Sequence, residues 1–240
     1  MYKANLSSVL FLDIECVPQQ PSFFDLDEGL QELREKKSAR LLQSPSIENT
    51  TSVDELYDNR SWIFAEFWKI IVISVWYIQN IEWTQTFRAK SFSWDDEKKL
   101  LEEFFDMLNT HYTKSDQTIC GHNIKEFDIP YICRRALIHW LRLPTILDST
   151  HKKPWEINHL DTLEMRRFGE RRSFISLDLL CRILNIPTPK TDISWEQVAR
   201  VYRDEKDLSR IQQYCERDIY AVAQVLLKFL YNDQYLAYEE

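Results

Sequence analysis

Two carboxylates at one end of an apolar strand are the first residues in the sequence that could do chemistry. In the segment VLFLDIEC, Asp13 and Glu15 end a run of apolar side chains. Alternate residues of a strand point to the same face, so Asp13 and Glu15 share a face with Val9 and Phe11. Two oxygen ligands on one rigid strand suit a hard divalent cation. The D-x-E pattern is nevertheless common and recurs at 95–97, where it opens a predicted helix and needs no metal.

Two further acids lie where such a cation site could use them. Asp128, in TICGHNIKEFDIPYI, lies between a short predicted strand that ends at Gly121 and a predicted helix. A plain helix N-cap is the alternative for Asp128. Asp218 falls on the apolar stripe of a predicted helix over 206–230, where a carboxylate needs a cationic partner or a metal. An ion pair with an arginine is the alternative there. Tyr214 precedes Asp218 by one turn on the same face, so four acids and one tyrosine together predict a site for two cations.

The predicted elements must bring these distant segments together. Strands are expected at 9–14, 69–78, 82–89 and 118–120, with a strand or short helix at 159–163. Helices are expected at 30–42, 95–108 (with Ser93 as N-cap), 130–140, 176–184, 195–202 and 206–230. Strands first, then helices alternating with strands, predict an α/β fold with a mixed sheet. We expect one domain over residues 1–240, with a polar helical insertion at about 18–66.

Composition narrows the class of protein. With 240 residues, 44% of them hydrophobic, the chain can bury a sizeable core. It has no apolar run of 18 residues, so we expect no membrane-spanning helix, and its start lacks the long apolar region of a signal peptide. The five cysteines are scattered and form no C-x-x-C pair, which predicts neither a disulfide framework nor a zinc site. A reduced, cytoplasmic setting is therefore expected.

The charge balance opposes tight, non-specific coating of nucleic acid or anionic membrane. Thirty Lys and Arg residues against 38 Asp and Glu residues give a net charge of −8. Half of that charge belongs to the four proposed ligands, which two divalent cations would neutralise. Residues 134–172 carry nine basic and five acidic side chains. This stretch could form a local track for phosphates or simply a set of solvated faces.

Read together, the three motifs resemble those of the DEDD superfamily of 3′–5′ exonucleases, which have a ribonuclease H-like fold. FLDIEC resembles the first motif, GHNIKEFD the second and YCERD the third. Tyr214, four residues before Asp218, is similar to the tyrosine branch of that superfamily. Similarity is strongest to stand-alone predicted exonucleases related to the proofreading domain of family-B DNA polymerases, and it extends over most of the chain. The resemblance implies a ribonuclease H-like α/β fold with a mixed sheet of five or six strands.

The resemblance also implies an activity. It suggests a metal-dependent exonuclease that hydrolyses phosphodiester bonds at the 3′ end of single-stranded nucleic acid, with DNA favoured over RNA. Two Mg²⁺ or Mn²⁺ ions would be held by Asp13, Glu15, Asp128 and Asp218, and Tyr214 would orient the attacking water. Any polymerase or repair partner would act in trans. The alternatives are an exoribonuclease and a non-catalytic nucleic-acid-binding member of the fold.

Several neighbouring residues would contact substrate on the same resemblance. Asn123 and Phe127 would lie against the terminal nucleotides, by hydrogen bond and by stacking, although Phe127 could equally anchor the helix start as a core aromatic. His122 adjoins Asn123, and packing within the loop is its alternative role. Asp161 could be another acid near the site, but we expect it to make structural hydrogen bonds.

The chain departs from the family pattern at three positions near these motifs. Cys16 stands where relatives commonly have Thr or Ser in contact with the 3′ end, and its thiol does not provide the same hydrogen bond. Trp68 stands where close relatives tend to have glycine, and a glycine-bearing turn is replaced near Trp195. These departures bear on how the substrate fits more than on metal binding.

Overall fold

A mixed five-stranded sheet organises the chain, with the strand order β3-β2-β1-β4-β5. The computed structural model describes residues 5–42, 63–81, 84–170, 172–187 and 192–230. The first three strands are antiparallel neighbours: β1 (Val9–Pro18), β2 (Trp68–Ile81) and β3 (Thr84–Ser93). The last two run parallel to β1: β4 (Thr118–Gly121) and β5 (Leu160–Asp161). The predicted α/β class and mixed sheet are confirmed, and the architecture is consistent with a ribonuclease H-like fold.

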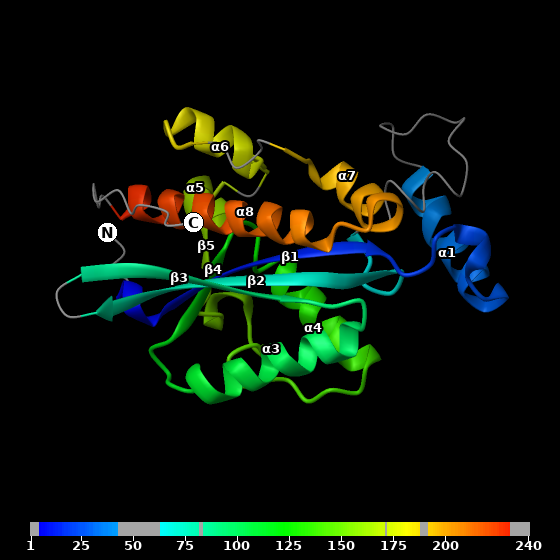
Figure 1. Cartoon of the computed structure of the whole chain (residues 1–240), viewed down its shortest axis with the longest axis horizontal. Coiled ribbons are helices and arrows are strands. Elements are labelled where there is room, and N and C mark those ends of the chain that lie inside the picture. Colours follow the sequence, from blue (N-terminus) through cyan, green and yellow to red (C-terminus); the bar gives the residue numbers. More distant parts are fainter. Residues whose placement is uncertain (1–4, 43–62, 82–83, 171, 188–191, 231–240) are drawn as a thin grey trace.

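Helices cover both faces of this sheet (Figure 1). One face carries the long helix α8 (Leu208–Phe229) together with the short α5 (Thr162–Arg167), α6 (Leu177–Ile183) and α7 (Trp195–Arg200). The other face carries α3 (Glu97–His111) and α4 (Asp128–Ile138), while α1 (Glu28–Leu42) lies beyond one end of the sheet. The remaining described turns of helix are η1 (Leu6–Ser8), η2 (Phe23–Asp25), η4 (Pro154–Glu156) and η5 (Val201–Glu205).

The alternation of β1 explains how one strand serves two apolar layers. Leu10, Leu12 and Ile14 belong to the core between the sheet and helices α3 and α4. Val9 and Phe11 instead pack with residues of α8. Because successive side chains of a strand point to opposite faces, Asp13 and Glu15 continue the row of Val9 and Phe11 toward α8, as predicted.

Some predicted boundaries are wrong for local reasons. Helix α3 begins at Glu97 rather than near Asp95, and Asp96 is its N-cap, accepting a hydrogen bond from the Lys99 N–H at 3.2 Å. Ser93 instead ends β3, and its hydroxyl donates to Gln212 at 3.1 Å. The segment at 159–163 contains both predicted forms, first β5 and then α5.

The extent of the domain and of its insertion stays a prediction. Positions 43–62 of the proposed insertion at 18–66 lie outside the described residues, as do positions 82 and 83 of the predicted third strand. Among the described helices, none combines the length and the apolar character that crossing a bilayer requires.

Candidate functional site

The pairing of β1 with β2 has a bulge directly after Glu15. Glu15 pairs with Val72 but the next residue, Cys16, pairs with Ile70, so Ile71 is an extra residue on β2. The Ile70 N–H donates instead to the Glu97 carboxylate at 2.7 Å. A bulge bends its strand and re-aims nearby side chains. The irregularity therefore lies in β2, directly opposite the Glu15–Cys16 step of β1.

The loop between β4 and α4 carries the second motif, and Asp161 holds it in place. The Asp161 carboxylate accepts hydrogen bonds from the backbone N–H groups of Asn123 at 3.0 Å and Lys125 at 3.2 Å. The same carboxylate also caps α5 through the N–H groups of Leu163 and Glu164. Asp161 thus makes the structural hydrogen bonds expected of it, and it locks the loop to the end of β5.

Two features of this loop depend on residue type. Asn123 adopts the left-handed conformation, with a φ of 64°, which asparagine tolerates better than most residues. A Cβ at Gly121 would lie 2.8 Å from the Cβ of Ile124, so the chain can fold back closely only over a glycine. The N-cap of α4 is Phe127, and Asp128 is the first helical residue, so Asp128 is not the plain cap considered as its alternative.

Helix α8 contributes the third motif from its buried stripe. Tyr214 is 3% exposed, and Asp218 follows it by one helical turn. Between them, the Cys215 thiol donates a hydrogen bond to the Asp13 carboxylate at 3.4 Å. Tyr214 thus lies on the buried stripe of α8, and Tyr214 and Asp218 line the same cavity.

One cavity of about 420 Å³ collects the predicted site residues from all three motifs. Its volume lies within the range of small-molecule binding pockets. The nine predicted residues that line it are Asp13, Glu15, Cys16, His122, Asn123, Phe127, Asp128, Tyr214 and Asp218. It also contains Trp68 and Trp195, which the sequence marks as departures that bear on substrate fit. The lining residues that the sequence does not single out are Ile14, Phe174, Ser176, Leu177 and Asp178.

Burial and neighbouring negative charges raise the pKa values of acids in the cavity. Burial raises the pKa of Asp13 well above its ordinary value, and the negative charges of Asp128, Asp218 and Glu15 raise it further. Burial also raises the pKa of Asp128 to about 7. Among the described residues, no lysine or arginine lines the cavity.

This donor set fits divalent cations. Ligand atoms of Asp13, Glu15 and Cys215 lie within 4.8 Å of one another. Asp128 and Asp218 lie outside that group but line the same cavity. Carboxylate oxygens suit hard ions such as Mg²⁺ and Mn²⁺. Burial raises the pKa of the Cys215 thiol well above its usual range, so at neutral pH Cys215 is a thiol that donates to Asp13.

The raised pKa values predict a particular pH dependence for the metal-free protein. Between about pH 4 and pH 7, folded Asp128 keeps a proton that the unfolded chain has already lost. The free energy of unfolding should therefore fall as the pH rises through this window. Millimolar Mn²⁺ should raise the melting temperature, and more at pH 8 than at pH 5, because protons compete for the ligands. Thermal melts across this range with and without Mn²⁺ measure both effects, and a melting temperature indifferent to Mn²⁺ at pH 8 would contradict a cation site.

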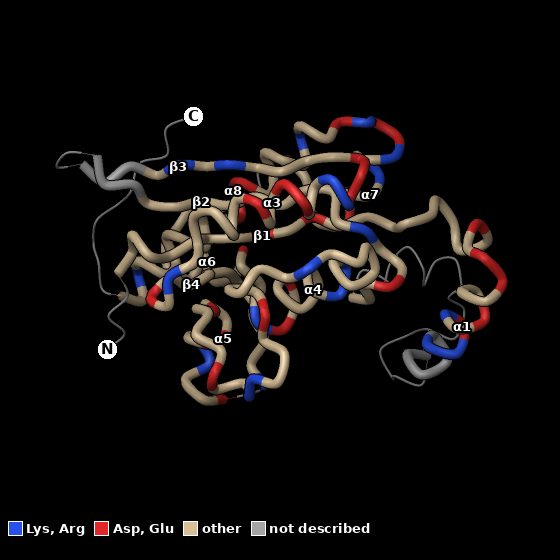
Figure 2. Tube along the Cα trace, turned by 90° about the horizontal axis from the view of Figure 1, so that it is seen from below, with Lys and Arg blue, Asp and Glu red and all other residues tan. Residues whose placement is uncertain are grey.

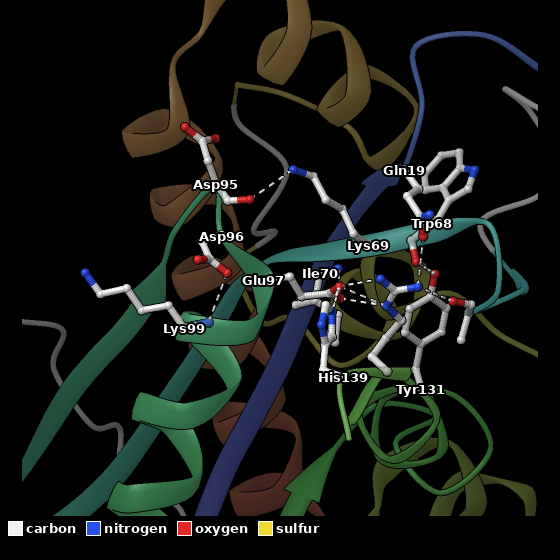
Figure 3. A network of polar contacts seen from close by, with 12 residues as sticks. Gln19, Trp68, Lys69, Ile70, Asp95, Asp96, Glu97, Lys99, Tyr131 and His139 are labelled. Carbon is white, nitrogen blue, oxygen red and sulfur yellow. Dashed lines mark hydrogen bonds and ion pairs between the residues drawn. The ribbon is translucent and has the colours of Figure 1, made fainter. Parts of the chain in front are cut away.

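A buried polar network supports the strand ends behind the cavity (Figure 3). The Arg135 guanidinium pairs with the Glu97 carboxylate, and their side chains are both 3% exposed. Arg135 also donates to the Ala65 carbonyl at 2.7 Å, while the Tyr131 hydroxyl donates to the Trp68 carbonyl at 3.3 Å. Helices α3 and α4 thereby fix the chain entering β2, where Trp68 lines the cavity.

This network corrects part of the sequence analysis. From the sequence alone, Glu97 is expected only to favour the first turn of its helix, and the stretch 134–172, which includes Arg135, is predicted to form either a local track for phosphates or a set of solvated faces. Arg135 is 2% exposed and engaged with Glu97, so it cannot contact a strand on the surface. Figure 2 shows the Lys and Arg positions of α4 and α5 interspersed with acidic positions rather than gathered in one band. Arg171, another member of that stretch, lies outside the described residues.

The remaining predicted substrate residues have protein contacts of their own. The Nε2 of His122 donates to the Ile175 carbonyl at 2.9 Å, and its Nδ1 lies 2.9 Å from the Thr162 hydroxyl. Both ring nitrogens thus serve packing within the protein. Phe127 packs on Tyr131 with ring centroids 5.3 Å apart, which supports its anchoring role without removing it from the cavity. Burial raises the pKa of the Cys16 thiol, which keeps it protonated.

Comparison with known proteins adds one finding. The family model described as "Predicted 3'-5' exonuclease related to the exonuclease domain of PolB" matches residues 60–240. Asp128, Tyr214 and Asp218 lie within that match, whereas Asp13 and Glu15 precede it and reach the same cavity through β1. No curated protein matches the chain.

Proposed function

Because the chain belongs to the family of predicted 3′–5′ exonucleases related to the exonuclease domain of PolB, we propose that it removes nucleotides from the 3′ end of single-stranded nucleic acid. DNA is the favoured substrate. The observation that carries this proposal is the convergence of four acids, from β1, the start of α4 and α8, on one cavity without a basic side chain among its described lining residues.

The four acids would hold two Mg²⁺ or Mn²⁺ ions. Asp13 would be a ligand, and the negative charges of Asp128, Asp218 and Glu15 all raise its pKa. Glu15, Asp128 and Asp218, which line the same cavity, would be the other ligands. When bound, such ions lower the pKa of water and neutralise the charge that develops during phosphodiester cleavage.

Tyr214 would position the water that attacks the phosphodiester. Burial raises the pKa of its hydroxyl far above the ordinary value, and the negative charges of Asp218, Glu15 and Asp13 raise it further. The hydroxyl therefore stays protonated at neutral pH and donates a hydrogen bond to the Asp218 carboxylate. A group that does not ionise can orient a water by hydrogen bonding but is a poor general base.

Replacing Tyr214 by phenylalanine tests this role. We expect kcat to fall roughly 10- to 100-fold, less than removing a true general base would cause. Because no acid is changed, the affinity for Mn²⁺ should stay within about twofold, as measured by calorimetric titration. Tyr202→Phe is the matched control, since the Tyr202 hydroxyl donates to Asp95 at 2.8 Å near the surface. Unchanged turnover in Tyr214→Phe would remove Tyr214 from the mechanism.

Residues around the acids would receive the strand end. Asn123 presents an amide to the cavity, and Phe127 offers a ring beside it. Cys16 and His122 lie against the same space and would contact the terminal nucleotide through apolar atoms, because their polar atoms are protonated or engaged within the protein. A polymerase or repair partner in trans would supply strand ends that need trimming.

The experiment that tests the proposed function is a degradation assay on 5′-labelled single strands, with DNA and RNA side by side. A ladder that shortens from the 3′ end in Mn²⁺ and is absent in EDTA supports a metal-dependent 3′–5′ exonuclease. Faster loss of the RNA strand would favour the exoribonuclease alternative. Binding without any metal-dependent product would favour a non-catalytic member of the fold, and internal cleavage products would contradict exonuclease activity.

A further inference from the structure

The cavity has two chemically different surfaces. Its acidic part contains the four proposed ligands, Asp13, Glu15, Asp128 and Asp218, and Asp178 is a further acid in the lining. Besides Tyr214, four large rings line the cavity: Trp68, Phe127, Phe174 and Trp195. Acids alone would suit a cation, but a wall of aromatic rings beside them suits a ligand with flat apolar faces.

Packing within the core accounts for only two of these rings. Trp68 is 5% exposed and belongs to the core between the sheet and helices α3 and α4, and Phe127 packs against that core. Phe174 and Trp195, in contrast, keep 67% and 43% of their surface exposed. Large aromatic side chains that stay exposed within a cavity indicate a surface for a ligand rather than a part of the core.

The backbone around both rings is held by hydrogen bonds. Phe174 precedes Ile175, whose carbonyl accepts the hydrogen bond from His122, and Ser176 then caps α6. Trp195 is the first residue of α7, directly after a capping box in which the Ser194 N–H donates to the Gln197 side chain at 2.9 Å. Phe174 thus lies in the loop that leads into α6, and Trp195 lies at the start of α7, so both rings are positioned next to hydrogen-bonded backbone.

The described lining of the cavity does not have the basic side chains that usually bind the phosphates of a nucleic-acid strand. Phosphates are ordinarily neutralised by Lys and Arg, which give a steep dependence of affinity on salt. Among the described residues that line this cavity there is neither. A strand bound here would have cations at the acids for its terminal phosphate, and its bases would have to contribute the remaining affinity.

We propose that Phe174 and Trp195 are substrate-binding residues that stack on the unpaired bases of the strand next to the scissile phosphate. The inference rests on the proposed function and adds that stacking on the bases is the source of affinity for the strand. Every base has an aromatic face, so this surface accepts a strand of any sequence, in DNA or RNA, provided that its end is unpaired.

The test compares binding of a strand that carries bases with binding of an abasic strand. The full chain, with Ca²⁺ in place of Mg²⁺ to slow hydrolysis, is titrated into a labelled oligothymidylate and into an abasic strand of equal length and charge, with fluorescence anisotropy as the readout. The wild type should bind the oligothymidylate at least about 10-fold more tightly than the abasic strand. Phe174→Ala and Trp195→Ala should each weaken oligothymidylate binding about 10-fold and leave abasic binding unchanged, while Trp195→Phe should retain most of the affinity.

Trp155→Ala is the matched control, because Trp155 is 76% exposed and lies on η4, away from the lining of the cavity. It should bind both strands as the wild type does. Equal wild-type affinity for the two strands, or equal weakening of both in Phe174→Ala and Trp195→Ala, would overturn the inference while leaving the proposed function intact. Failure of the metal-loaded wild type to bind either strand would overturn both. Thermal melts establish that each variant is folded.

Discussion

The Asp13→Asn variant is expected to lose about 1000-fold or more in kcat while becoming more stable than the wild type in the absence of metal. Asparagine keeps the shape of the side chain but removes the charge at the centre of the acidic cluster. Loss of that charge removes an ion ligand, which explains the lost activity. It also removes repulsion with Asp128, Asp218 and Glu15, the charges that raise the pKa of Asp13. Activity and stability should therefore move in opposite directions.

Both quantities are measured on the same preparation, as turnover of a labelled single strand in Mn²⁺ and as the melting temperature in EDTA. Asp192→Asn is the matched control, since Asp192 is exposed and pairs with Arg210, which holds the pKa of its carboxyl below the usual value. That variant should keep its activity and gain no stability. Full activity in Asp13→Asn would remove Asp13 from the site, and an unchanged or lower melting temperature in EDTA would contradict the crowding of the acids.

Local patterns in the sequence were enough to place the acids. The alternation of β1 put Asp13 and Glu15 on the α8 side, and the apolar stripe of α8 put Asp218 and Tyr214 toward β1. Both inferences depend only on the period of one strand or one helix, which the sequence displays directly. The parallel pairing of β1 and β4 then places the end of β4, and so the loop before Asp128, beside the middle of β1.

Such local patterns do not predict contacts between segments that are distant in the sequence. Glu97 and Arg135 are 38 positions apart, and each has an ordinary local explanation, as an acid in a first helical turn and as a base in a basic stretch. The bulge at Ile71 depends on pairing between two strands, and no signal in either strand alone announces it. Phe174 was missed for the same reason, because only the fold brings it into one cavity with Trp195, whose position the sequence already marks as a departure from the family pattern.

The Glu97–Arg135 pair carries the largest expected effect on stability. Glu97→Gln keeps the size of the side chain but leaves the Arg135 charge buried without its ionic partner. Removing one member of a buried ion pair costs about 3–5 kcal/mol in the free energy of unfolding. Arg135→Met should cost a similar amount. The double variant should lose clearly less than the sum of the two, because no unbalanced charge then stays buried.

Urea unfolding of the two single variants and the double variant measures this coupling, and the same helix offers a control. Glu102 pairs with Lys98 on the exposed side of α3 at 3.9 Å, so Glu102→Gln should change the free energy of unfolding by less than about 0.5 kcal/mol. Equal effects of Glu97→Gln and Glu102→Gln would mean that the buried pair stabilises no more than a surface pair. Glu97 also accepts the Ile70 N–H beside the bulge, and Arg135 holds the Ala65 carbonyl. A large coupling would therefore show that the energy of this pair secures the strand ends from which Glu15 and Trp68 reach the cavity.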